Sequence, residues 1–167
     1  MAVLMQDVIE RLTEIMESQD LSYKFYSEMT PTFSLTFPLR NTKLRSVNIR
    51  VHLMPSSPGA EDCAKIVSLG FVGLRADADC VQEVAELLHR INFGTSFGNF
   101  DLDFNDGEIR YKMSLNCVDT MPGKDAIEDL WVVPTIMVSR YANSLLEVVM
   151  GISSAKDAYD RVHGPED

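Results

Sequence analysis

Residues 81–117 contain the feature that most limits how this chain can fold. Apolar residues recur at helical spacing from 81 to 91, which predicts an amphipathic helix with one buried face. Beyond it, apolar and polar residues alternate strictly at 100–104 and again at 109–115. This alternation is the period of half-buried strands, so the stretch predicts a helix followed by two paired strands.

The turn between these two strands is predicted at Asp106 and Gly107. An Asp-Gly pair suits a hairpin turn of type I′ or a related type, which needs positive φ at two positions. We therefore expect Asp106 and Gly107 to be structural turn residues of a tight hairpin.

The same two periodicities predict the elements before this stretch. Residues 3–19 form the clearest amphipathic helix, with an apolar stripe opposite a charged one. Segments with extended or strand character follow at 21–26, 33–39, 47–53 and 64–74. Gly70 and Gly73 inside the last of these indicate a bulge or a close approach of another backbone.

A long apolar helix is predicted at 125–150. Pro134 should kink it or divide it, because proline cannot donate the expected hydrogen bond. Near its end, 145–150 contains one polar residue, Glu147, so the helix needs more cover than one sheet provides. The first helix, the C-terminal tail or a second copy can supply that cover, and we predict a homodimer.

These elements predict an α+β fold, with helices packed against an antiparallel sheet of about five strands in the order α-β-β-β-α-β-β-α. A length of 167 residues predicts one domain, at 1–152. Residues 153–167 are expected to be a short helical or frayed tail.

Charge is distributed unevenly along the chain. The net charge is −10 and the sequence pI is about 4.7, which argues against binding to nucleic acid or to an anionic membrane. No acidic residue lies between residues 30 and 60, where Arg40, Lys43, Arg45 and Arg50 form a basic strip. We predict that this strip binds an acidic surface of a partner or of a second copy, and the alternative is a solvated positive face.

The cysteines and the apolar segments predict a cytoplasmic protein. Three cysteines without CxxC spacing, in a sequence without a secretory leader, favour reduced thiols. The most apolar segment, 130–138, is too short to span a bilayer, so no membrane association is expected.

No motif predicts catalysis, a cofactor or a metal site. Asp101, Asp103 and Asp106 resemble part of a calcium loop, but Asp106 stands where that loop needs glycine and Lys112 where it needs glutamate. The three histidines have no metal-ligand spacing, and no GxSxG nucleophile motif occurs. We therefore expect a protein that is not an enzyme.

The aromatic residues Phe93, Phe97 and Phe100 cluster around two glycines at the corner between the predicted helix and the hairpin. They either seal this corner as part of the core, which is the commoner role of such residues, or line a small ligand pocket.

The chain resembles the YbjN-like domain family in three short segments. These are Ile91, Asn92 and Phe93, then the strand 98–103, then the return strand 106–111. The resemblance implies the fold of type III secretion chaperones, which are small, acidic, often dimeric proteins that bind polypeptides, and it implies no catalytic residues. The leading prediction is a chaperone-like or regulatory protein-binding domain. The alternatives are a dedicated type III secretion chaperone, or a small-molecule-binding protein or enzyme using the 93–100 corner.

Overall fold

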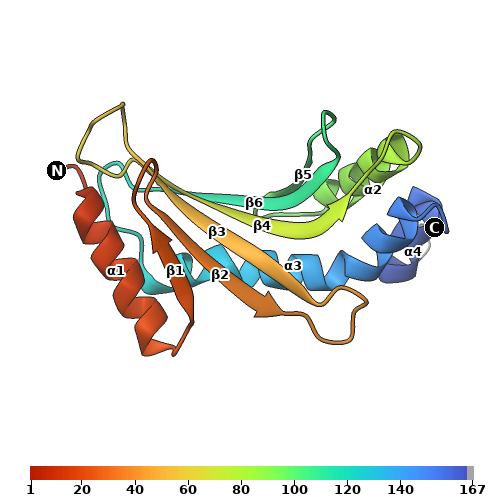
Figure 1. The fold of residues 1–167 in the computed structure, drawn as a ribbon, viewed down its shortest axis with the longest axis horizontal. Helices are drawn as coiled ribbons and strands as arrows, with labels where there is room; N and C mark the ends of the chain where they lie inside the picture. Colours follow the sequence, from red (N-terminus) through yellow and green to blue (C-terminus); the bar gives the residue numbers. More distant parts are fainter. Residues whose placement is uncertain (165–167) are drawn as a thin grey trace.

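The computed structural model describes residues 1–164, and its architecture is α+β (Figure 1). The elements in chain order are α1 (Met5–Ser18), β1 (Tyr23–Tyr26), β2 (Thr32–Pro38), β3 (Ser46–Met54), β4 (Lys65–Arg75), α2 (Val81–Phe93), β5 (Asn99–Leu102), β6 (Glu108–Asn116), α3 (Lys124–Val149) and α4 (Ala155–His163).

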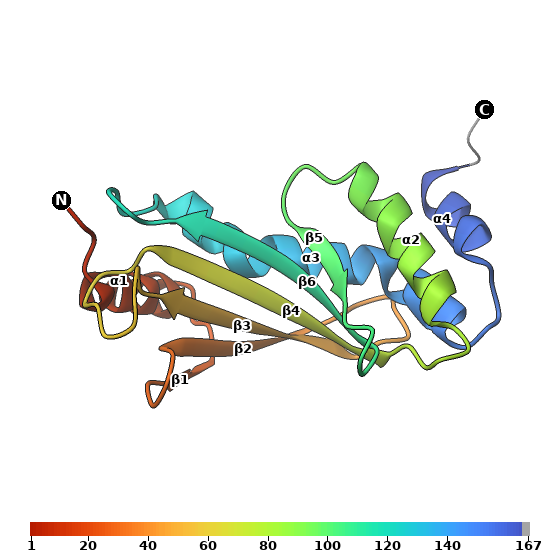
Figure 2. The same cartoon turned by 90° about the horizontal axis from the view of Figure 1, so that it is seen from above.

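All six strands form one antiparallel sheet in the order β1-β2-β3-β4-β6-β5 (Figure 2). The predicted fold class is confirmed, with one strand more than expected. The additional strand is β1, the short extended segment, which pairs with β2 from Tyr23↔Leu35 to Tyr26↔Thr32. The short tail helix is α4, and the part of the predicted tail beyond residue 164 lies outside the described residues.

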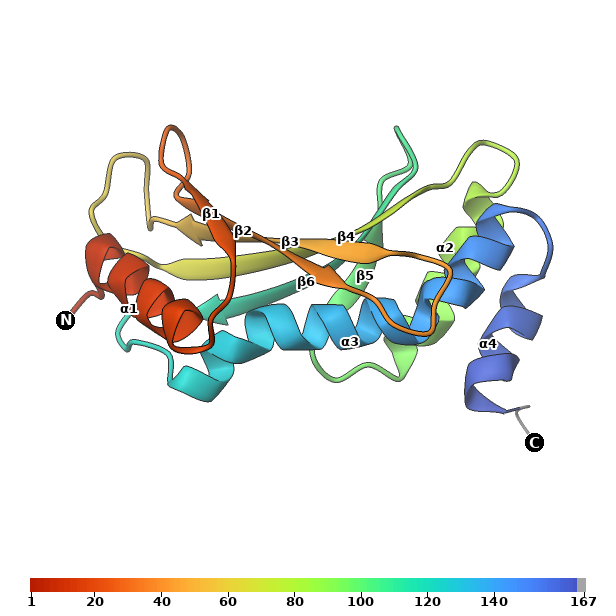
Figure 3. The same ribbon diagram turned by 60° about the horizontal axis from the view of Figure 1, so that its bottom comes forward.

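The helix α3 packs across one face of the sheet, and α1 lies on the same side (Figure 3). The close contact with α3 is made by β4. Gly70 in the middle of β4 leaves room for α3, because a Cβ built on it would lie 3.0 Å from Cβ of Pro134. Gly70 thus marks a close approach, as predicted, but the approaching atoms belong to the Pro134 side chain and not to another backbone. Gly73, at φ +76°, lies where the β4–β6 register shifts, which confirms the predicted bulge.

Of the two outcomes predicted for Pro134, a kink or a division of the last helix, the division does not occur, because α3 is continuous over its 26 residues. Proline at position 134 leaves the carbonyl of Leu130, four residues earlier, without its usual helical donor. The buried hydroxyl of Ser68, on β4, donates a hydrogen bond to this carbonyl. The sheet thus supplies the hydrogen bond that proline removes, which allows a buried helix to contain it.

The predicted hairpin between β5 and β6 is present, but its turn differs from the prediction. Gly107 has φ +74°, whereas Asp106 is outside the positive-φ region, so the two-position type I′ geometry is wrong. The loop is longer than two residues and is closed by Gly107 N–H donating to Asp103 O (2.7 Å) and Asp103 N–H donating to Glu108 O (3.0 Å). Phe104, expected in the strand, is exposed in this loop.

Most of the apolar end of α3 is covered within the same chain, although Met150 is exposed. Leu145 and Val148 are buried, and α4 packs beside them with Ala158 fully buried. Ser144 Oγ donates to the Ala158 carbonyl (3.0 Å), which ties the two helices together. Of the three predicted sources of cover, the C-terminal tail is therefore the one observed in a single chain.

Candidate functional site

The sheet face opposite α3 has no helix over its central strands in the described chain (Figure 3). Side chains alternate along β4, so Val67, Leu69 and Phe71 point away from α3 while Ser68 and Gly70 point toward it. These three apolar side chains are only half-buried. Strand β4 thus places an apolar stripe along the middle of the sheet face opposite α3. We call this face the open face.

Cationic side chains flank this stripe on both sides. The register pairs Lys24 with Ser34, Ser34 with Arg50, Arg50 with Leu69, and Leu69 with Lys112, so these residues form one row across five strands. Strands lie about 4.8 Å apart, and the three cations are therefore spaced by roughly 10 Å along the row. Arg110 pairs with Phe71 in the next row, and Lys65 lies at the start of β4.

The cations of the open face differ in how they are paired. Arg110 and Lys112 both reach Asp101 of β5, at 3.5 Å and 2.9 Å. Within residues 1–164, Lys24 and Arg50 have no ion pair. The Arg50 guanidinium instead lies 4.9 Å from the centre of the Phe71 ring, a cation–π contact. The face therefore offers unpaired positive charge next to apolar surface.

His52 belongs to the same face and is uncharged at neutral pH. Burial, followed by the nearby charges of Arg50 and Arg110, lowers its pKa below the ordinary value. Its Nδ1 makes a 2.9 Å hydrogen bond with Thr32 Oγ1. His52 therefore acts as a neutral polar residue of the face unless the medium is acidic.

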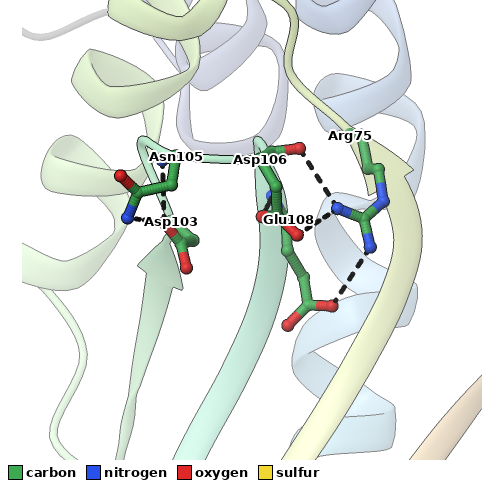
Figure 4. A network of polar contacts seen from close by, with 5 residues as sticks. All are labelled: Arg75, Asp103, Asn105, Asp106 and Glu108. Atoms are coloured by element: carbon green, nitrogen blue, oxygen red, sulfur yellow. Dashed lines mark hydrogen bonds and ion pairs between the residues drawn. The ribbon is translucent and has the colours of Figure 1, made fainter.

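The β5–β6 hairpin gives one end of this face the opposite charge (Figure 4). Arg75 contacts Asp106 and lies 3.6 Å from Glu108, and the Arg75 hydrogen bond holds the pKa of Asp106 below its usual range. Asp103 instead accepts hydrogen bonds from the backbone and side-chain nitrogens of Asn105 (2.8 and 2.9 Å). The tip carries three carboxylates and one nearby cation, so the positive region of the face ends here.

The structure separates the four residues of the predicted basic strip. Arg50 lies on the open face, whereas Arg40, Lys43 and Arg45 lie in the exposed loop between β2 and β3. The amide of Lys43 donates to Asn143 Oδ1 of α3 (2.9 Å), which fixes this loop beside the helix. Arg45 is five residues from Arg50, roughly 16 Å along an extended strand, so these cations form no single cluster.

The prediction missed Lys24, Lys65, Arg110 and Lys112 as members of the face. The alternation in β6 already placed Arg110 and Lys112 opposite the core residues. Their distance from Arg50 depends on β6 lying next to β4, which no local pattern encodes. A usable signal was present in β4, where apolar residues occupy both phases of the strand.

The aromatic side chains of the 93–100 corner only partly close off the core. Phe100 is buried and makes edge-to-face contacts with Tyr111 (4.9 Å) and Tyr141 (6.0 Å) between ring centres. Phe93 and Phe97 are 92% and 68% exposed, so the expectation that all three seal the corner is wrong for these two. Phe97 lines a cavity of about 260 Å³ that opens at this corner.

All three cysteines are free and buried. Cys117 shares a hydrogen bond with Cys63, and this bond, together with burial, raises the pKa of the Cys117 thiol. A thiol held protonated in this way is a poor nucleophile. Among residues 1–164, no cluster of three or more His, Cys, Asp or Glu side chains is arranged to hold a metal ion. Over the same residues, every helix is too short or too polar to cross a bilayer.

Comparison with known protein-family models and with curated protein sequences finds no match for this chain. The resemblance to YbjN-like domains therefore continues to rest on the three segments in which it was noted. The open face and the corner cavity are identified from the geometry of this chain alone.

Proposed function

We propose that this chain is a non-enzymatic protein-binding domain, with a chaperone-like or regulatory role, and that its open face binds an acidic amphipathic helix of a partner protein. The observation that carries the proposal is the apolar stripe of β4 flanked by cations on a chain with net charge −10. The positive charge of the open face is opposite in sign to the net charge of the protein. It attracts acidic partners and repels basic ones.

A helix is the proposed binding element because of the shape of the surface. A sheet with one apolar stripe on each face is normally covered by helices, and α3 already covers the other face. An amphipathic helix can place an apolar stripe on Val67, Leu69 and Phe71. Its flanking glutamates then lie near Arg50 on one side and Lys112 on the other.

The proposal is tested with a designed amphipathic peptide that has leucine on one face and glutamate elsewhere. Fluorescence anisotropy should show binding that weakens as salt is added. The double variant Arg50→Glu with Lys112→Glu should lower the affinity at least tenfold and flatten the salt dependence. The matched control is Arg45→Glu in the β2–β3 loop, which should change the affinity much less.

Two further probes decide the outcome. The same peptide with lysine in place of glutamate should not bind, and neither should single-stranded oligouridine. Equal binding of both peptides, or tighter binding of the oligonucleotide, would overturn the proposal. Circular dichroism of each variant ensures that loss of affinity is not loss of fold.

The secretion-chaperone alternative differs from this proposal in specificity. A dedicated chaperone would bind one effector sequence far more tightly than a generic acidic helix. A scrambled peptide of the same composition, with its amphipathicity preserved, separates the two because a generic face should bind it equally well.

A further inference from the structure

We infer that the cavity at the 93–100 corner is a binding site for a small organic monoanion with an aromatic or other apolar body. This site goes beyond the proposed protein binding and lies among the helices, away from the open face. The cavity of about 260 Å³ is bounded by the end of α2, the loop before β5, one residue of β6, the middle of α3 and the end of α4.

The walls of the cavity are mainly apolar and aromatic. On α3, Val133, Met137 and Arg140 lie at i, i+4 and i+7, so they form one stripe of the helix that faces the cavity. Tyr111 from β6 and Phe97 from the loop add aromatic surface, and the Tyr111 hydroxyl is occupied by a hydrogen bond to the Phe97 carbonyl. Such walls suit a flat apolar ligand.

Arg140 supplies the charge of the site. Its guanidinium carbon lies 5.5 Å from the centre of the Tyr141 ring, and within residues 1–164 it forms no ion pair. No aspartate or glutamate is among the residues that line the cavity, although the chain carries 25 of them. A pocket with one unpaired cation and no carboxylate selects an anion.

The other polar groups of the cavity add no second charge. His163 is stacked against Tyr141 and Tyr159, and burial together with Arg140 lowers its pKa, so it is neutral near pH 7. Its Nε2 is hydrogen-bonded to the Tyr141 hydroxyl (2.6 Å). Thr95 Oγ1 donates to the Ile91 carbonyl (2.8 Å), whereas the Ser96 hydroxyl is a neutral group that can donate to a ligand.

Size narrows the ligand class further. Pockets for drug-sized molecules occupy roughly 300–1,000 Å³, and this cavity is smaller. A single ring that carries one carboxylate fits these limits. The carboxylate would meet Arg140 at the mouth while the ring contacts Met137, Val133 and Phe97.

A charge series with a shared ring tests the inference. Isothermal titration calorimetry would compare phenylacetate with neutral phenylacetamide and cationic phenethylamine, which differ only in the polar group. Phenylacetate should bind at least about tenfold more tightly than the amide, as expected for one charge-assisted hydrogen bond. Phenethylamine should not bind.

Three variants locate the binding. Arg140→Gln should abolish the difference between phenylacetate and phenylacetamide, and Val133→Phe should weaken both by filling the cavity. Arg11→Gln, on α1, is the remote control and should change neither. Equal affinity for all three compounds, an unchanged series in Arg140→Gln, or no saturable binding up to ~10 mM would overturn the inference. Binding of the acidic helical peptide by Arg140→Gln should be unaltered, so failure here is distinct from failure at the open face.

Discussion

At Gly107 two separate constraints act on the same position. The residue has φ +74°, and a Cβ built on it would overlap the carbonyl oxygen of Ala76. The Ala76 amide also donates to the Gly107 carbonyl (2.9 Å), so the two backbones are held in contact. Backbone strain alone would make Gly107→Val cost roughly 1–3 kcal/mol.

With the second constraint included, even Gly107→Ala should lower the free energy of unfolding by more than about 3 kcal/mol. Gly59→Ala is the matched control, since Gly59 has φ +80° but no atom within 4 Å of the added Cβ. It should cost only about 1 kcal/mol, the strain of the backbone conformation. Urea denaturation measures both, and equal losses would show that contact with Ala76 contributes nothing.

Ser68 and Pro134 should depend on each other energetically. Ser68→Ala leaves the buried Leu130 carbonyl without a donor, which should cost about 1–3 kcal/mol. Pro134→Ala restores a backbone N–H that can donate to the same carbonyl, so Ser68→Ala should cost less than half as much in that background. A double-mutant cycle by urea denaturation measures the coupling. Identical costs in the two backgrounds would mean that the hydroxyl has another role.

At the scale of elements, periodicity alone predicted most of the fold. The stripe of α1 and the alternation in β2, β3 and β6 match the buried residues closely, because each pattern is local and repeats many times. The continuity of α3 was not predictable in the same way. The donor that replaces the hydrogen bond lost at Pro134 is Ser68, which is 62 residues from Leu130 in the sequence and reaches it only through the packing of β4.

The candidate site was less predictable than the fold. The alternation in β3 is enough to place Arg50 on the outward side of its strand, because alternation determines which way a side chain points. The loop cations near it in sequence proved to be separate, while Lys112 lies in the same row because β6 is inserted between β4 and β5. Strand order is a non-local property, and so is any surface that several strands build together.

The helix α4 should behave as part of the domain, although the sequence places it in a tail. Ala155 and Ala158 are fully buried, and the Ala155 amide donates to Glu83 Oε2 of α2 (2.7 Å). A chain ending at Ile152 should therefore melt at least about 5 °C below the full chain. A chain ending at Gly164 keeps α4 and serves as the control. If both shortened chains melt like the parent, α4 is a dispensable appendage.

At the scale of the whole molecule, α4 already covers most of the apolar end of α3, so the predicted homodimer needs a further apolar surface. Val132 and Ile136 provide one, since they lie one turn apart on α3 and are 41% and 58% exposed. They precede the cavity residues Val133 and Met137 by one position each, so an interface there would adjoin the corner cavity. We propose this part of α3 as the contact between two copies.

Salt distinguishes such a dimer from binding at the open face. Two copies that each carry a charge of −10 repel each other, so screening should strengthen an apolar dimer while it weakens binding of the acidic helix. Light scattering at micromolar concentration should show a dimer whose population rises with salt. Ile136→Glu should give monomers, whereas Ile152→Glu, at an isoleucine that is 66% exposed beyond α3, should leave the dimer intact. A monomeric parent at every salt concentration would rule out the homodimer, and a dimer that survives Ile136→Glu would place its interface elsewhere.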